Sequence, residues 1–131
     1  MLDASVVLKW FVARQEPRSD EAKAIRNQYR AGATTITVPP LLYLELLNVA
    51  GKRWGWDEAA LVQLASALED LGFEVADAEL AAIAVWTSRG LTAYDASYVA
   101  LAESRGVPLI TDDDRILSVA QSVAQALASS A

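Results

Sequence analysis

Acidic side chains recur in this sequence at places where a folded chain can gather them. Asp3 precedes the helical pattern "SVVLKWFV", and Asp95 lies in the helical pattern "AYDASYVALAESRG". Three aspartates, Asp112 to Asp114, follow directly on the apolar run "VPLIT". Glu45 lies inside "LLYLELLNV", where nearly every neighbour is apolar. Clustered carboxylates repel one another unless a cation neutralises them, and ligand sets made of oxygen alone suit Mg²⁺ or Mn²⁺. Such ions typically assist reactions at phosphate.

The residue types that are missing narrow the chemistry further. The sequence contains no histidine and no cysteine. Catalytic triads that need histidine, thiol nucleophiles, zinc–thiolate sites and disulfides are therefore excluded. Carboxylates, hydroxyls, lysine and arginine remain as the groups that can do chemistry.

Glu45 is the most informative single acid. A helix that is apolar all round is normally buried, so we expect Glu45 to point into the interior or into a cleft. An unpaired carboxylate there costs several kcal/mol. The structural alternative is an ion pair with an arginine such as Arg53. We favour a functional role for Glu45 over that alternative.

The other acids have structural explanations that remain open. Asp3 fits a plain helix N-cap. Thr92 with Asp95, and Thr111 with Asp114, have the spacing of a capping box. Taken singly, each of these acids is explained at least as well by capping as by catalysis. Taken together, acids that follow strands or open helices, plus one acid inside an apolar helix, indicate a site that binds a divalent cation.

The elements that must position these acids alternate along the chain. We predict helices over 5–12, 16–32, 41–54, 57–72, 78–90 and 93–106, strands over 34–39, 73–76 and 107–111, and a helical tail over 118–131. This order predicts an α/β fold, a three-layer α/β/α sandwich with a mainly parallel central sheet. Ligands bind outside the carboxyl ends of the strands in such sheets. Only Met1 and Leu2 precede Asp3, so we expect the strand there to be a stub or the chain start to be unusual.

Size and charge set the broad class. The chain has 131 residues, which predicts a single domain over 1–131, and 53% of them are hydrophobic, which is enough for a core. No apolar stretch approaches the ~18 residues of a membrane span, so we expect no membrane partner. No signal peptide is recognisable, and the absence of cysteine fits a cytoplasmic location. The net charge of −6 gives no indication of a basic groove for nucleic acid. Any contact with RNA must be local or mediated by metal ions.

Three blocks of sequence resemble a known family. They are "LDASVVLKWF" near the start, "PPLLYLELLNV" in the middle and "LTAYDASYVALAESRGVPLITDDDRI" near the end. In this order they are similar to the PIN domain, and most closely to the VapC-type toxins of toxin–antitoxin systems. The resemblance implies a PIN-like α/β/α sandwich with an acidic metal pocket. It also implies an endoribonuclease that depends on Mg²⁺ or Mn²⁺, forms a homodimer and is inhibited by a VapB-type antitoxin.

The resemblance also assigns roles to residues by their positions. Asp3, Glu45, Asp95 and Asp113 correspond to the catalytic acids that hold the metal. Ser5, Asn48 and Thr111 correspond to polar residues that support the pocket, and we expect Asp112 to be a supporting or solvated acid and Asp114 to be the capping partner of Thr111.

The expected reaction is cleavage of RNA by a water that the metal activates. Lys9, Arg14 and Arg115 lie near the acids in sequence and are candidates for holding the RNA backbone. Two alternatives remain. One is a PIN-like module that binds protein without catalysis, and the other is a metal-dependent phosphatase that acts on small substrates.

Overall fold

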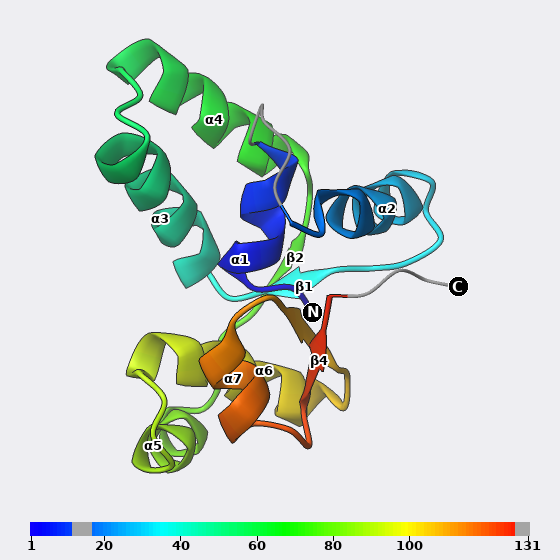
Figure 1. Cartoon of the computed structure of the whole chain (residues 1–131), viewed down its shortest axis with the longest axis vertical. Coiled ribbons are helices and arrows are strands. Elements are labelled where there is room, and N and C mark those ends of the chain that lie inside the picture. Colours follow the sequence, from blue (N-terminus) through cyan, green and yellow to red (C-terminus); the bar gives the residue numbers. More distant parts are fainter. Residues whose placement is uncertain (12–16, 128–131) are drawn as a thin grey trace.

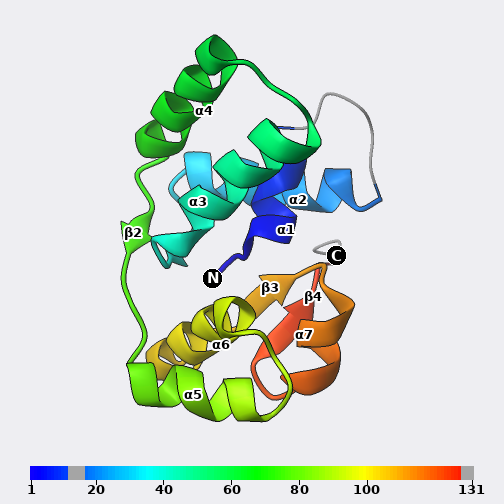
Figure 2. The same cartoon turned by 90° about the vertical axis from the view of Figure 1, so that its left-hand side faces the viewer.

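The computed structural model describes residues 1–11 and 17–127. Helices lie on both sides of short parallel strands, with α1 to α4 on one side and α5 to α7 on the other (Figures 1 and 2). The helical elements are α1 (Ala4–Val7), the 3-10 turn η1 (Leu8–Trp10), α2 (Ser19–Arg30), α3 (Leu41–Asn48), the π-helical turn η2 (Val49–Arg53), α4 (Glu58–Asp70), α5 (Leu80–Ser88), α6 (Ala93–Arg105) and α7 (Asp114–Val119). The predicted α/β sandwich with parallel strands is confirmed.

The strands form two parallel pairs. In one pair, β1 (Thr37–Val38) lies beside β2 (Glu74–Val75), and Thr37 is opposite Glu74. In the other, β3 (Leu109–Thr111) lies beside β4 (Ala124–Ala126), and Leu109 is opposite Ala124. Because the strands of each pair run the same way, their carboxyl ends lie at the same edge of the pair. Helix α7 begins shortly after β3, and α1 begins shortly after Leu2, which bridges to β3.

The strand before Asp3 is a stub, as its length predicts. Leu2 forms a single parallel bridge to Ile110 of β3. The Ile110 N–H donates to the Met1 carbonyl at 2.9 Å, and the Asp3 N–H donates to the Ile110 carbonyl at 3.5 Å. The side chain of Leu2 is buried. This short contact suffices to bring Asp3 beside the end of β3.

The predicted helical tail is wrong over residues 124–126. Helix α7 ends at Val119, and the chain turns to form β4 alongside β3. Leu109 N–H donates to the Val123 carbonyl at 3.0 Å, and Leu127 N–H donates to the Thr111 carbonyl at 3.2 Å. The alanines and glutamines of this segment favour a helix in isolation, but pairing with β3 and burial of Leu127 override that preference. Residues 128–131 lie outside the described residues.

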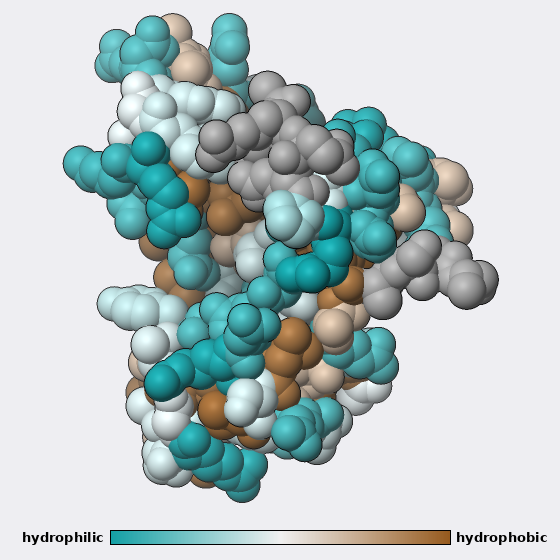
Figure 3. All heavy atoms as spheres, in the orientation of Figure 1, coloured by the Kyte–Doolittle hydropathy of each residue, from teal (hydrophilic) through white to brown (hydrophobic). Residues whose placement is uncertain are grey.

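Every helix and strand predicted up to residue 111 has a counterpart, with ends shifted by a few residues. The core includes Leu42 and Leu46 of α3, Val99 of α6 and Leu109 of β3. On the face drawn in Figure 3, hydrophilic residues cover most of the surface and hydrophobic ones show through in smaller patches. Among the described helices, none is both long and apolar enough to span a membrane.

Candidate metal centre

Asp3 is held at the edge of the sheet by two hydroxyls and a backbone amide. It is the N-cap of α1, and its Oδ1 accepts hydrogen bonds from the Ser5 N–H at 3.1 Å and the Ser5 hydroxyl at 2.6 Å. Its Oδ2 accepts a hydrogen bond from the hydroxyl of Thr111 at the end of β3. Asp3 is only 4% exposed and Thr111 is fully buried. Asp3 therefore caps α1 and can also be part of the pocket. The three residues Asp3, Ser5 and Thr111 lie together, as the resemblance implies.

The buried carboxyl of Asp3 resists ionisation. Burial raises its pKa to about 6, although the hydrogen bonds from Ser5 and Thr111 oppose that rise. The nearby Asp113 carboxylate adds to the rise. Among the described residues no lysine or arginine is ion-paired with Asp3. A cation bound beside this carboxyl would stabilise its ionised form.

Asp113 caps the helix that follows β3. Its Oδ1 accepts hydrogen bonds from the N–H groups of Arg115 at 2.9 Å and Ile116 at 3.0 Å, so Asp113 is the N-cap of α7. The prediction that Thr111 and Asp114 form the cap is therefore wrong. The Thr111 hydroxyl instead accepts from the Asp113 N–H at 3.0 Å while donating to Asp3. Because the Thr111 hydroxyl donates to the buried Asp3 carboxylate, the side chain of Asp113 forms the cap.

Asp95 lies in the first turn of α6. Thr92 is the N-cap of this helix, and its hydroxyl accepts from the Asp95 N–H at 3.1 Å, which confirms that Thr92 caps the helix. The Asp95 side chain is half-buried. Burial raises its pKa, and Asp113 raises it further. The Asp113 carboxylate thus acts on both Asp95 and Asp3. We call the region formed by these three acids and Glu45 the acidic corner.

Glu45 faces α6 from α3. It is half-buried, and its Oε1 accepts a hydrogen bond from the Tyr98 hydroxyl at 2.5 Å. Burial raises its pKa, the bond from Tyr98 opposes the rise, and Asp95 adds to it. In the part of the chain that the structure describes, no ion pair joins Glu45 to Arg53, so the structural alternative for this acid is not realised. The interior side of α3 is formed by Leu42 and Leu46.

Tyr98 is a member of this site that the sequence analysis missed. It is 1% exposed, and its pKa is raised by burial and by Glu45, with smaller contributions from Asp3 and Asp95. The hydroxyl therefore stays protonated and can donate to Glu45. A usable signal was present, because Tyr98 lies three residues after Asp95 and hence on the same side of α6.

Asp112 differs from the four acids above because protein cations neutralise it. Lys9 lies 3.2 Å from its carboxylate and Arg18 forms a second, closer ion pair. Its N–H donates to the Ser5 hydroxyl at 2.9 Å. Asp112 is thus a supporting residue that fixes Ser5, and its charge is already balanced. Because the Lys9 side chain is 7% exposed and turned toward Asp112, Lys9 is a poor candidate for holding RNA.

The side chains of Asn48 and Arg115 form no hydrogen bond or ion pair with an acid among the described residues, although the charge of Arg115 is near enough to lower the pKa of Asp95. Asn48 is exposed at the end of α3, and no hydrogen bond within the described ranges joins it to an acid. Arg115 is exposed and donates to the Gly90 carbonyl at 3.0 Å. Arg14 lies outside the described residues.

The donor chemistry fits a hard divalent cation, although the carboxylates stand apart. Asp3, Glu45, Asp95 and Asp113 offer oxygen ligands only, and no described lysine or arginine is ion-paired with any of them. Within the described residues, no three acids are close enough as they stand to form a complete ligand set. Mg²⁺ commonly keeps several waters and binds directly to only one or two carboxylates. Carboxylates that are spaced apart can therefore still hold it.

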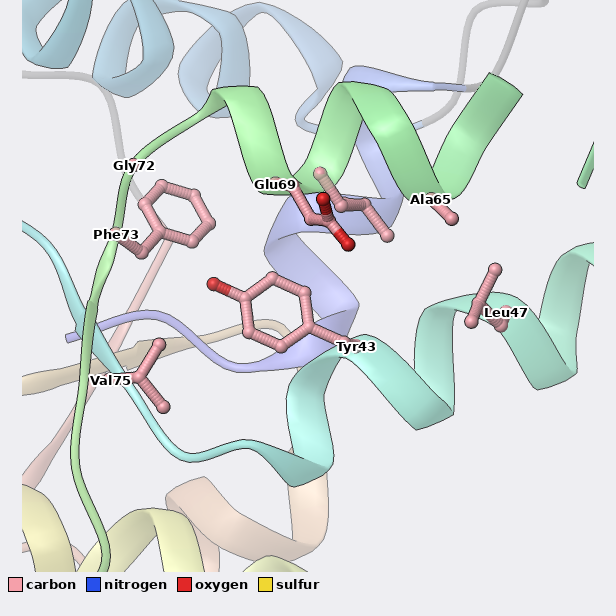
Figure 4. A pocket seen from close by; sticks show the side chains of 8 residues that line it. Tyr43, Leu47, Ala65, Glu69, Gly72, Phe73 and Val75 are labelled. Carbon is pink, nitrogen blue, oxygen red and sulfur yellow. The ribbon is translucent and has the colours of Figure 1, made fainter. Parts of the chain in front are cut away.

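An apolar groove is separate from these acids. A groove of about 440 Å³ lies between α3, α4 and β2, and Figure 4 shows Tyr43, Phe73 and Val75 around it. Leu47 and Leu68 also line it, and Glu69 is its acidic member. The groove lacks the four candidate acids, so it does not form part of the metal centre.

Comparison with known proteins identifies the fold. The sequence matches the PIN domain family over residues 1–122 of 131. The chain belongs to the PIN domain family. This is a nuclease-type fold, and PIN domains generally bind divalent metals. The structure is similar to the crystal structure of PAE2754 from Pyrobaculum aerophilum, with a TM-score of 0.64 and 25% sequence identity over 96% of this chain and 88% of that chain. A comparison with curated protein sequences finds no match.

Proposed function

We propose that this PIN domain is an endoribonuclease dependent on Mg²⁺ or Mn²⁺, and that it is the toxin of a VapBC-type toxin–antitoxin system. The supporting observation is the set of four carboxylates, Asp3, Glu45, Asp95 and Asp113. They come from four separate places in the sequence, lie within electrostatic reach of their neighbours in the set, and have no described lysine or arginine paired to them. We leave Asp112 out of the proposed ligand set because Lys9 and Arg18 already balance its charge.

A divalent cation bound there supplies an activated water for attack on phosphorus and neutralises the carboxylates so that an RNA phosphate can approach. The chain supplies rigid ligands. Ser5 and Thr111 fix both oxygens of Asp3, and the backbone of α7 fixes Asp113. Tyr98 holds one oxygen of Glu45. The sequence contains no histidine, so no imidazole is available as a general base.

Cleavage of RNA under controlled metal content tests this proposal. The purified protein should cut RNA with Mn²⁺ or Mg²⁺ and should stop with EDTA. Asp3→Asn should abolish cleavage, whereas Asp70→Asn, at an exposed position at the end of α4, should retain it. Cleavage by Asp3→Asn at the wild-type rate would refute the assignment.

The same assay separates the two alternatives. A protein that neither cleaves RNA nor gains thermal stability with either metal ion would be a binding module. A protein that hydrolyses a generic phosphate ester but leaves RNA intact would be a phosphatase.

We also propose a VapB-type antitoxin as a partner and a homodimer as the working form. Exposed apolar side chains support both, including Leu44 of α3 and Leu80 of α5, which are 64% and 81% exposed. The apolar groove in Figure 4 offers a further surface for a partner. Coexpression with the neighbouring reading frame, scored by growth and by copurification, tests the antitoxin. Light scattering of the isolated chain tests the dimer.

A further inference from the structure

We infer that Tyr98 is a positioning residue for Glu45. The hydroxyl of Tyr98 holds the Glu45 carboxylate in the orientation required to bind the cation. The inference rests on the proposed function, because it assigns a role within the same metal centre. Tyr98 does not touch the substrate or the reacting atoms in this role, and it acts only through Glu45.

The hydrogen bond joins two helices that meet at the site. The Tyr98 hydroxyl on α6 donates to Glu45 Oε1 on α3 at 2.5 Å. Among the described residues it is the single side-chain hydrogen bond between these helices. Asp95 lies one turn before Tyr98, so α6 presents one candidate ligand and the support of another on the same side. The bond therefore ties Glu45 of α3 to the helix that carries Asp95.

The geometry leaves one carboxylate oxygen available. Within the described residues, Glu45 Oε1 accepts from Tyr98, and no hydrogen bond is made to Oε2. A glutamate side chain has several rotatable bonds, and fixing one of its oxygens restricts the positions of the other. Partners of this kind orient the ligands of metal sites, and their loss typically weakens metal affinity or activity ~10- to 100-fold.

The hydroxyl and the ring of Tyr98 have different roles. The ring is buried and fills the core, as a phenylalanine ring would, but only the hydroxyl reaches Glu45. Tyr29 provides the contrast, because its hydroxyl donates to the backbone carbonyl of Leu71 at 2.6 Å. Both tyrosines thus satisfy a hydroxyl by one hydrogen bond, but only Tyr98 uses a candidate ligand as the acceptor.

Mn²⁺ titration of matched variants tests the inference. Tyr98→Phe removes only the hydroxyl, and Tyr29→Phe removes a comparable hydroxyl outside the acidic corner. The Mn²⁺ dissociation constant is measured by calorimetry on the metal-free proteins, and their thermal unfolding is recorded in EDTA. The Mn²⁺ concentration for half-maximal RNA cleavage is measured alongside the rate at saturating Mn²⁺.

We expect Tyr98→Phe to bind Mn²⁺ ~10- to 100-fold more weakly and to need correspondingly more Mn²⁺ for cleavage, with much of the maximal rate recovered at saturation. Tyr29→Phe should bind Mn²⁺ as the wild type does. In a Glu45→Gln background, Tyr98→Phe should cause no further loss of affinity.

Three results would overturn the inference. Wild-type Mn²⁺ affinity in Tyr98→Phe would show that the hydroxyl does not act on the site, even if wild-type protein binds Mn²⁺ and cleaves RNA. Failure of Tyr98→Phe to fold, while Tyr29→Phe folds, would assign the hydroxyl to stability. Absence of Mn²⁺ binding by the wild type would remove the proposed function, and the inference with it.

Discussion

The hydroxyl of Thr111 donates a hydrogen bond to the carboxylate of Asp3, which is 108 positions away in the sequence. The same hydroxyl accepts from the N–H of Asp113 at 3.0 Å. One fully buried threonine therefore connects the first and the fourth of the candidate metal ligands. The last residue of β3 is thus part of the framework that positions these acids.

Replacement of Thr111 by valine should test this connection. Valine has nearly the same shape but leaves the buried Asp3 carboxylate and the Asp113 N–H without their partner. We expect the free energy of unfolding to fall by about 1–3 kcal/mol. The pKa of Asp3 should rise further above its ordinary value, because the Thr111 bond now lowers it. Denaturant unfolding at pH 7 measures the first effect. An unchanged free energy would show that water replaces the hydroxyl.

The stability of the metal-free protein should fall as the pH rises from about 4 to about 6. The pKa of Asp3 is raised by burial from 3.8 in the unfolded chain to about 6 in the folded chain. A group with a raised pKa stabilises the fold below pH 4 and loses that contribution as the pH passes 6. The loss is on the order of 3 kcal/mol.

Unfolding in EDTA across this range, with Asp3→Asn as control, measures the loss. The Asn variant should show a flatter curve, although Glu45 and Asp95, whose pKa values are also raised, will keep some dependence on pH. Identical curves for the two proteins would contradict the assignment to Asp3.

Asp112 and Asp113 should respond in opposite ways to the same change. Asp113→Asn should abolish the stabilisation by Mn²⁺ while keeping the cap of α7, because asparagine caps helices as well as aspartate does. Asp112→Asn should keep the response to Mn²⁺ but lower the free energy of unfolding. Lys9 and Arg18 lose an ionised partner in this variant, and we expect a loss on the order of 2 kcal/mol, since Arg18 is half-exposed and partly screened. Thermal melts with and without Mn²⁺ distinguish the two. The reverse pattern would show that Asp112 is the ligand.

The sequence predicted those parts of the fold that depend on local patterns. Apolar periodicity located the helices, and the spacing of Thr92 and Asp95 identified a cap. Residues that can form more than one hydrogen bond or secondary structure were harder to place. Thr111 has cap spacing, but the buried Asp3 recruits its hydroxyl, so Asp113 became the cap. Strand β4 was missed because its alanines and glutamine favour a helix until β3 offers a partner.

The candidate site shows the same division. Asp3, Glu45 and Asp95 are conspicuous by their positions in the sequence, whereas the family resemblance was needed to select Asp113 among three consecutive aspartates. Tyr98 was missed despite its spacing from Asp95, because a tyrosine among apolar residues is normally a core residue, and only the fold shows that its hydroxyl reaches Glu45. The ion pairs of Asp112 likewise join residues 94 and 103 positions apart, counted as 112 − 18 and 112 − 9.

The bridge between Leu2 and Ile110 has a consequence for how the pocket opens. Residues 1–3 are attached to residues 108–111 by three main-chain hydrogen bonds, by the bond from the Thr111 hydroxyl to Asp3 and by the burial of Leu2, so we expect this short segment to open more readily than the longer elements of the core. Asp3 moves with it. A cation held by Asp3 would slow that opening, and by reciprocity a firmly seated first segment would hold the cation more tightly. The Ile110 amide bonds to Met1, so its hydrogen exchange reports the opening of this segment. We expect slower exchange when the ion is present.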